Sequence, residues 1–198
     1  RFIDGKAGHD KQSLGLVENL KNQTKCRVFD FNVQSQTNPI LNIIFNNYKL
    51  PEGITKPDIA IGAGHKTHLH LLAVKRCLNA KIVVIMKPSL PLKLFDLCVI
   101  PQHDDVKSVN NVFITNTTLV NFNLNTKKKE DMALFLIGGP SKHFYWNSKI
   151  LLEQIKNISK KFKFKKLLIT TSRRTPIDFI DEFNRLKIKN IKLHEYTK

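Results

Sequence analysis

The hydrophobic residues of this 198-residue chain fall into short blocks that alternate between two patterns. Continuous apolar runs, such as 81–86 (KIVVIM) and 132–137 (MALFLI), are typical of strands buried on both faces of a parallel sheet. Between such runs lie segments with apolar residues on one helical face, such as Leu14, Val17 and Leu20. The alternation predicts an α/β protein in which helices connect parallel strands.

The predicted elements follow one another in strand–helix order. Strands are predicted at 2–3, 26–31, 59–61, 81–86, 95–100, 112–115, 132–137, 167–171 and 191–194, and helices at 11–20, 40–45, 69–78, 146–162 and 177–186. This pattern predicts two Rossmann-like parallel-sheet domains.

The predicted boundary between the domains is a polar stretch. Residues 121–131 (NFNLNTKKKED) carry a charge run and little apolar content, so they are expected to form a linker or an exposed loop. We therefore predict an N-terminal domain at 1–125, a linker at 126–131 and a C-terminal domain at 132–198. Only about three strands are predicted in the C-terminal domain, so it is expected to be incomplete. Residues 1–3 resemble the end of a strand, which also suggests a fragment.

Glycine, cationic and hydroxyl residues follow the predicted strands at their carboxyl ends. In parallel topology these ends meet at one edge of a sheet, where helix N-termini and free backbone N–H groups favour phosphate. The alternative is that the glycines only make tight turns, because neither GxxxxGK[ST] nor a full GxGxxG is present. The candidate phosphate-binding or substrate-binding residues are Gly5, Lys6, Gly8, Gly62, Gly64, His65, Lys66, Gly138, Gly139, Ser141, Lys142, Ser172, Arg173 and Arg174.

Two histidines are candidates for acid–base chemistry. His9 precedes Asp10, and the two could form a catalytic pair or simply begin a helix. His103 precedes two aspartates and could act as a general base or cap the next segment. A third cluster, HxxHxH at 65–70, has no neighbouring carboxylate, so no metal site is expected there. Thr175 before Pro176 is expected to cap a helix.

The chain carries a formal net charge of +17, with a sequence pI of about 9.9. Residues 126–198 hold 18 Lys and Arg against 7 Asp and Glu, so most of the excess lies there. This balance suits a nucleic acid, an anionic membrane surface or a phosphate-bearing substrate, although it could also reflect compositional bias. Nucleic-acid binding is not expected, because aromatic residues are not interleaved with the basic clusters.

Five motifs occur in one order along the chain: GKAGHDKQ, PDIAIGAGHKTH, LFDLCVIPQHD, LFLIGGPSKHFYW and TTSRRTP. In this order they resemble the mitochondrial fission (elongated mitochondria) family, in its bacterial-type members. That family is in turn similar to GT-B glycosyltransferases, which have two Rossmann-like domains and a cleft between them. The resemblance implies a GT-B-like fold with an acceptor side at 1–125 and a donor side at 132–198.

The resemblance also implies a function and a location. It implies a glycosyltransferase that uses a nucleotide-sugar donor, with no metal and no other cofactor, on an envelope or lipid-linked acceptor. His9, or alternatively His103, would be the base, and Lys142 and Arg173 would stabilise the leaving diphosphate. The protein would be cytoplasmic, peripheral to the bacterial inner membrane. The alternative is a non-catalytic scaffold that recruits a dynamin-related GTPase to a membrane surface.

Overall fold

The computed structural model describes residues 1–120, 131–141, 144–162, 166–187 and 191–197. The chain forms two compact units, Arg1–Leu124 and Asn125–Lys198, which are described separately below. The linker predicted at 126–131 lies outside the described residues, apart from its last residue.

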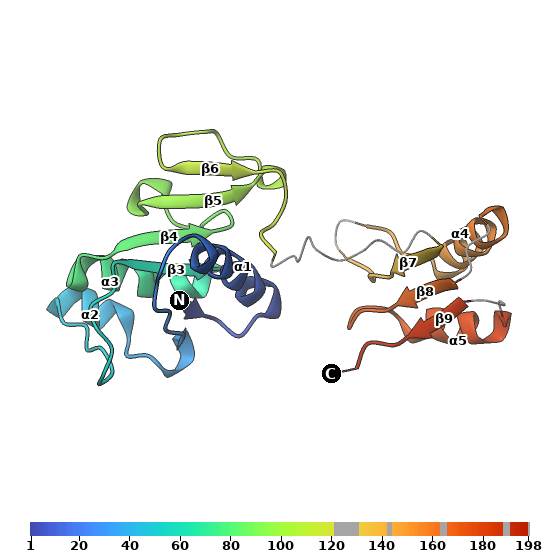
Figure 1. Ribbon diagram of the computed structural model, residues 1–198, viewed down its shortest axis with the longest axis horizontal. Coiled ribbons are helices and arrows are strands. Elements are labelled where there is room, and N and C mark those ends of the chain that lie inside the picture. Colours follow the sequence, from blue (N-terminus) through green and yellow to red (C-terminus); the bar gives the residue numbers. More distant parts are fainter. Residues whose placement is uncertain (121–130, 142–143, 163–165, 188–190, 198) are drawn as a thin grey trace. The chain divides into compact units, whose positions relative to one another are not determined.

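The first unit is built on a parallel sheet of six strands, which confirms the predicted α/β class (Figure 1). The strand order is β2-β1-β3-β4-β5-β6, and every neighbouring pair is parallel. The strands are β1 (Phe2–Ile3), β2 (Phe31–Asn32), β3 (Ile59–Ala63), β4 (Lys81–Ile85), β5 (Leu97–Pro101) and β6 (Val112–Thr115).

Helices cover both faces of this sheet. On one face, Val17 of α1 (Ala7–Gln23) packs in a cluster with Ile61 of β3 and Val83 of β4. On the other face, α3 (His68–Leu78) contributes Leu71 to a larger core, and α2 (Pro39–Phe45) packs beside α3. Residues of β3, β4 and β5 alternate between the two cores, so their continuous apolar runs follow from burial on both faces.

The strand order reverses at β1. β1 lies between β2 and β3, although β2 follows β1 in sequence. In open α/β sheets, such a reversal makes the carboxyl ends of the two flanking strands the usual place for a ligand. The turn after β1 and the turn after β3 therefore face the most favourable position on this sheet for a site.

The second unit has a parallel sheet of three strands in the order β7-β8-β9, among the residues described. Its strands are β7 (Met132–Leu136), β8 (Lys166–Thr170) and β9 (Ile191–His194), and its helices are α4 (Ser148–Lys161) and α5 (Ile177–Leu186). The predicted strands and helices of this unit are confirmed to within one or two residues at each boundary.

Two predicted elements of the first unit have different bounds. The strand predicted at 26–31 forms only at Phe31–Asn32, because β1 offers ladder partners to those two residues alone. The helix predicted from residue 11 already begins at Ala7, because the Lys6 carbonyl accepts hydrogen bonds from the backbone N–H groups of His9 and Asp10.

Candidate active site

An aspartate and a histidine are joined at the carboxyl end of β1. Asp4 directly follows the strand, and its side chain is completely buried. Its Oδ2 lies 2.8 Å from Nδ1 of His9, in the first turn of α1, and its Oδ1 accepts a 3.0 Å hydrogen bond from the backbone N–H of Lys6. The His9 side chain is 18% exposed, so one part of the ring reaches the surface. The partner of His9 is therefore Asp4, whereas Asp10 lies in the first turn of α1, which agrees with the helix start and not with the catalytic pair considered above.

The turn after β3 closes against this pair. Gly64 has φ +84°, and a Cβ built on it would overlap the His9 ring and lie 3.1 Å from Asp4 Oδ2. A Cβ on Gly62 would lie 2.6 Å from Oγ1 of Thr67, which donates a 2.8 Å hydrogen bond to the Gly64 carbonyl. Both glycines are thus required by close internal packing, and Gly64 sets the position of the imidazole.

The electrostatics of Asp4 decide which nitrogen of His9 carries a proton. Burial acts to raise the Asp4 pKa, but the hydrogen bonds from His9 and from the Lys6 amide outweigh it, and the net pKa is lowered. Asp4 is therefore an ionised carboxylate that can only accept hydrogen bonds. In the neutral ring the proton must then sit on Nδ1, which leaves Nε2 with a free lone pair.

A buried amide lies one helical turn further along α1. Gln12 is 9% exposed, and its Nε2 lies 3.5 Å from Sδ of Met86, at the end of β4. Oε1 of Gln12 is buried without a hydrogen-bond partner. This side chain connects α1 to the residue that follows β4.

His103, the other candidate base, is held less firmly. It lies in a short 3₁₀ turn at Gln102–Asp104 after β5, and its side chain is 64% exposed. Its Nε2 is 3.8 Å from Oδ1 of Asp104, which is too long for a hydrogen bond. Asp104 instead accepts a 3.2 Å hydrogen bond from the backbone N–H of Lys87. Among the residues that the structure describes, no hydrogen bond holds the His103 ring, and its contact with Asp104 is long.

The HxxHxH cluster separates into exposed and buried members. His65 and Lys66 are exposed in a 3₁₀ turn before α3, whereas His68 and His70 are buried. Burial lowers the pKa of both buried histidines, and His65 lowers that of His68 further. The described part of the chain contains no group of three His, Cys, Asp or Glu side chains that could hold a metal ion.

A cavity of about 700 Å³ lies at the opposite edge of the first sheet. It is lined by the start of β3, at Ile59 and Ala60, and by Phe2, Tyr48 and Leu50. Neither Asp4 nor His9 contributes to it. The cavity therefore does not belong to the Asp4–His9 site.

In the second unit, two strand-end loops are locked together. Oγ1 of Thr175 donates a 2.6 Å hydrogen bond to the Gly138 carbonyl and accepts one of 2.9 Å from the backbone N–H of Ser172. A Cβ on Gly139 would overlap the backbone of Arg174, so only glycine permits this approach. The loops after β7 and β8 thus form one assembly at the carboxyl edge of their sheet.

The candidate phosphate contacts of this unit are placed as follows. Arg173 and Arg174 are exposed, and the Ser172 hydroxyl accepts a 3.2 Å hydrogen bond from the backbone N–H of Arg174. Ser141 lies in a short β-bridge with Phe144, and Lys142 is outside the described residues. The prediction that Thr175 caps α5 is wrong: the N-cap residue is Pro176, because the Thr175 hydroxyl is used across the two loops.

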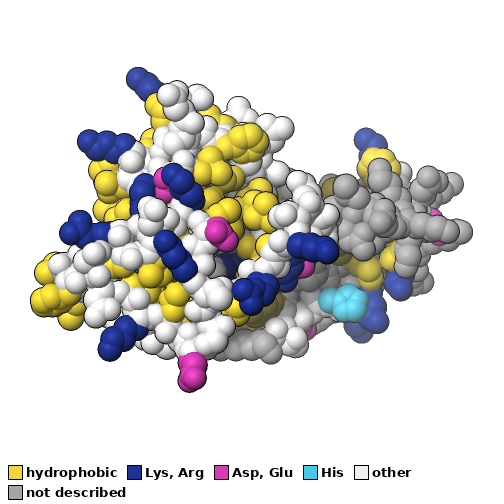
Figure 2. Space-filling model, turned by 60° about the vertical axis from the view of Figure 1, so that its left-hand side comes forward, with side chains coloured by type: hydrophobic (Ala, Val, Ile, Leu, Met, Phe, Trp, Pro, Cys, Tyr) yellow, Lys and Arg dark blue, Asp and Glu magenta, His cyan; other side chains and the backbone are white. Residues whose placement is uncertain are grey.

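Basic side chains are spread over the visible face of the molecule in Figure 2, with few acidic ones among them. The described helices include none that combines the length and apolar character needed to cross a membrane.

Comparison with known proteins places this chain in a family. The model of the family described as "Mitochondrial fission ELM1" matches residues 7–196. The chain belongs to the mitochondrial fission ELM1 family. It is also similar to the uncharacterized protein RP120 of Rickettsia prowazekii (strain Madrid E), with 27% identity over 113 residues. That alignment covers 52% of this chain and 31% of RP120, and no solved structure matches.

The family match confirms the resemblance drawn from the five motifs. It leaves the individual roles of the candidate residues as predictions. Asp4 was absent from the candidates, although its place directly after a strand, five residues before a histidine, was visible in the sequence. An aspartate after a strand is more often a turn residue, so the pairing became evident only from the helix geometry of α1.

Proposed function

We propose that this protein transfers a sugar from a nucleotide-sugar donor to a hydroxyl acceptor, in the manner of GT-B glycosyltransferases. The observation that carries the proposal is the 2.8 Å contact between His9 Nδ1 and buried Asp4 Oδ2 at the carboxyl edge of a parallel sheet. A carboxylate that holds one ring nitrogen and leaves the other free is the arrangement of a histidine general base. Membership of the ELM1 family and the strand reversal at β1 support the choice of site.

In the proposed step, Nε2 of His9 removes the proton of the acceptor hydroxyl. The acceptor oxygen forms a bond to the anomeric carbon of the donor sugar, and the bond from that carbon to the diphosphate breaks. Asp4 stabilises the imidazolium that forms. Arg173 and Arg174 would stabilise the negative charge on the nucleoside diphosphate as it leaves. The acceptor is proposed to be a lipid-linked or envelope molecule, reached at an anionic membrane surface.

The proposal is tested by donor binding and turnover. We expect at least one of UDP-glucose, UDP-N-acetylglucosamine and GDP-mannose to raise the melting temperature of the protein, and to release UDP or GDP when bacterial lipid extract is added. His9→Ala is expected to lower the rate at least about 100-fold, because a general base typically contributes that much. Donor binding should be little changed in this variant.

His103→Ala is the matched control, since it removes a histidine from the same sheet edge that has no firm partner. It should leave the rate within about twofold if His9 is the base. If His103→Ala abolishes turnover and His9→Ala does not, the assignment of the base is wrong. If no donor shifts the melting temperature, the transferase proposal fails, and the recruitment scaffold becomes the better hypothesis.

A further inference from the structure

The cavity at the amino end of β3 lies in line with β1. Residues 27–29, which lead into β2, line it on one side, and residues 59–61 of β3 line it on the other. Arg1 and Phe2 stand at its end. β1 itself lies between β2 and β3 in the sheet. The cavity of about 700 Å³ therefore takes up the position that a longer β1 would have between these two neighbours.

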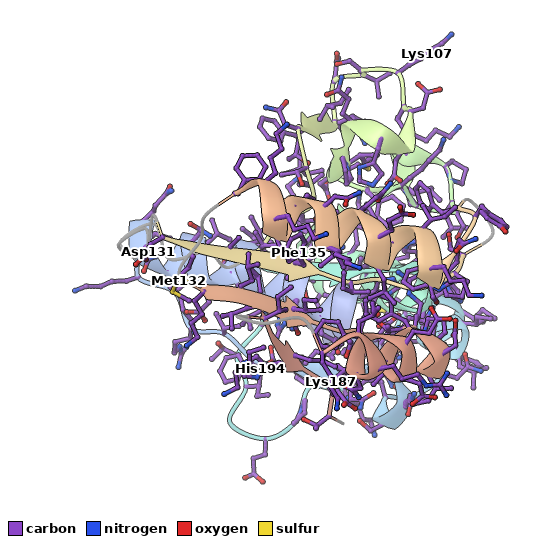
Figure 3. All side chains as sticks on the ribbon, turned by 90° about the vertical axis from the view of Figure 1, so that its right-hand side faces the viewer. Lys107, Asp131, Met132, Phe135, Lys187 and His194 are labelled. Carbon is purple, nitrogen blue, oxygen red and sulfur yellow. The ribbon has the colours of Figure 1, made fainter. Side chains whose placement is uncertain are left out.

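β1 pairs with only part of β3. β3 and β4 pair over all five residues of each strand, and so do β7 and β8, where Met132 and Phe135 of β7 are labelled in Figure 3. In the described part of the first unit, the register between β1 and β3 contains only the pair Phe2↔Gly62. Residues 59–61 of β3 thus have a partner strand on one side and the cavity on the other.

On its other side, β1 is joined to the segment that precedes β2. The nitrogen of Arg1 donates a 2.6 Å hydrogen bond to the Phe29 carbonyl, and the Arg1 carbonyl accepts one of 2.8 Å from the backbone N–H of Phe31. In a parallel ladder, one residue bonds in this way to the two residues that flank its opposite number. The ladder of β1 with this segment therefore continues in register up to the edge of the cavity.

The backbone groups of β3 beside the cavity point into it. Successive residues of a strand in a parallel sheet direct their N–H and C=O groups alternately to its two sides. The Asp58 carbonyl accepts a 2.9 Å hydrogen bond from the backbone N–H of Lys81, so Asp58 faces β4. Ile59 and Ile61 face the opposite way. A strand in the cavity would donate to the carbonyl of Ile59 and accept from the N–H of Ile61.

The walls of the cavity are apolar on both faces of the sheet. Val17 of α1 and Val74 of α3 belong to the cores on opposite faces, and both line the cavity. A strand there would direct apolar side chains alternately to the two cores, as β3 and β4 do. It would also give residues 26–31 the ladder partner that the strand predicted there requires.

We propose that this cavity binds an extended strand of the protein's own chain, formed by residues that lead into Arg1 and pair with 27–29 and 59–61. Continuity with the two ladders of β1 selects this occupant over a separate peptide. Burial lowers the pKa of the Arg1 amino group to about 6, and a neutral peptide N–H would make the same bond to Phe29 without a buried charge. Asp4 directly follows β1, so this strand would also hold the Asp4–His9 pair in place.

Two extended chains test this proposal. One carries Val-Val-Val directly before Arg1, and the matched control carries Val-Pro-Val, because proline disrupts pairing inside a sheet. Native-state hydrogen exchange of Phe29 and Ile61 is measured relative to Val84 of β4. In the valine chain both amides should exchange at least about tenfold more slowly than in the unextended chain. In the proline chain they should stay within about twofold.

Decanoate tests the other class of occupant, an anionic amphiphile that the lysines at the cavity, such as Lys25 and Lys56, could attract. It should not slow the exchange of Phe29 and Ile61 in the valine chain any further. Three results would overturn the proposal: no slowing in the valine chain, equal slowing in the proline chain, or protection of both amides by decanoate to the same degree in the unextended and valine chains.

Discussion

Among glycine-to-alanine substitutions around the Asp4–His9 site, Gly64→Ala should be the most damaging. Gly64 has φ +84° and ψ 156°, a region that costs a residue with a side chain about 1–3 kcal/mol. Its new Cβ would also overlap the His9 ring, and overpacking of this kind adds about 1–3 kcal/mol. We expect Gly64→Ala to lower the free energy of unfolding of the first unit by about 2–6 kcal/mol.

Alanine substitutions at two neighbouring glycines, Gly5 and Gly8, separate the conformational cost from the cost of overpacking. Gly5 has φ +78° and open space around its Cβ position, so Gly5→Ala should show only the conformational cost of about 1–2 kcal/mol. Gly8 lies in the first turn of α1 with open space and no positive φ. Gly8→Ala should therefore stabilise the unit by about 0.5–1 kcal/mol.

Native-state hydrogen exchange at the buried amides of β4 measures these free energies for the first unit alone. The chemical shift of His9 in each variant reports whether the ring has moved. If Gly64→Ala costs no more than Gly5→Ala and leaves the His9 resonance unchanged, the close packing of Gly64 against His9 is refuted.

Three further predictions concern polar side chains of the two units. Burial lowers the pKa of His68 and His70 in the folded protein. As the pH falls below about 6.5, these histidines therefore bind protons in the unfolded chain first, and the free energy of unfolding should decline. His70→Leu should flatten this dependence of the free energy of unfolding on pH. Gln12→Leu removes a buried oxygen without a partner and should stabilise the first unit by about 1 kcal/mol in the exchange assay. Thr175→Val should destabilise the second unit by about 1–2 kcal/mol in urea unfolding followed by Trp146 fluorescence.

The fold was largely predictable because strands that are buried on both faces consist of consecutive apolar residues, which are visible in the sequence. The run at 81–86 and the helix at 177–186 are examples in which the pattern gave the element nearly to the residue. The strand predicted at 26–31 was too long because strand length depends on the ladder partner, and β1 supplies only Phe2 and Ile3. That partner is distant in sequence and leaves no local signal.

The sequence predicts the position of the site better than it predicts which side chains pair within it. Parallel topology places His9 and Gly64 at one sheet edge, as the glycine-rich strand ends indicated. From the sequence alone, His9 and Asp10 could form a catalytic pair or begin a helix, and Asp4 was not considered. The hydrogen bond to Asp4 depends on α1 beginning at Ala7, which turns the imidazole back over the end of β1.

The most direct test of the account is the protonation of the His9 ring. In the protein labelled with ¹⁵N, the proton-coupled spectrum of the neutral imidazole should place the proton on Nδ1 and leave Nε2 without one. Asp4→Asn should remove this preference, because the amide can also donate to the ring. A proton found on Nε2 in the unaltered protein would contradict the assignment of His9 as the base that Asp4 orients.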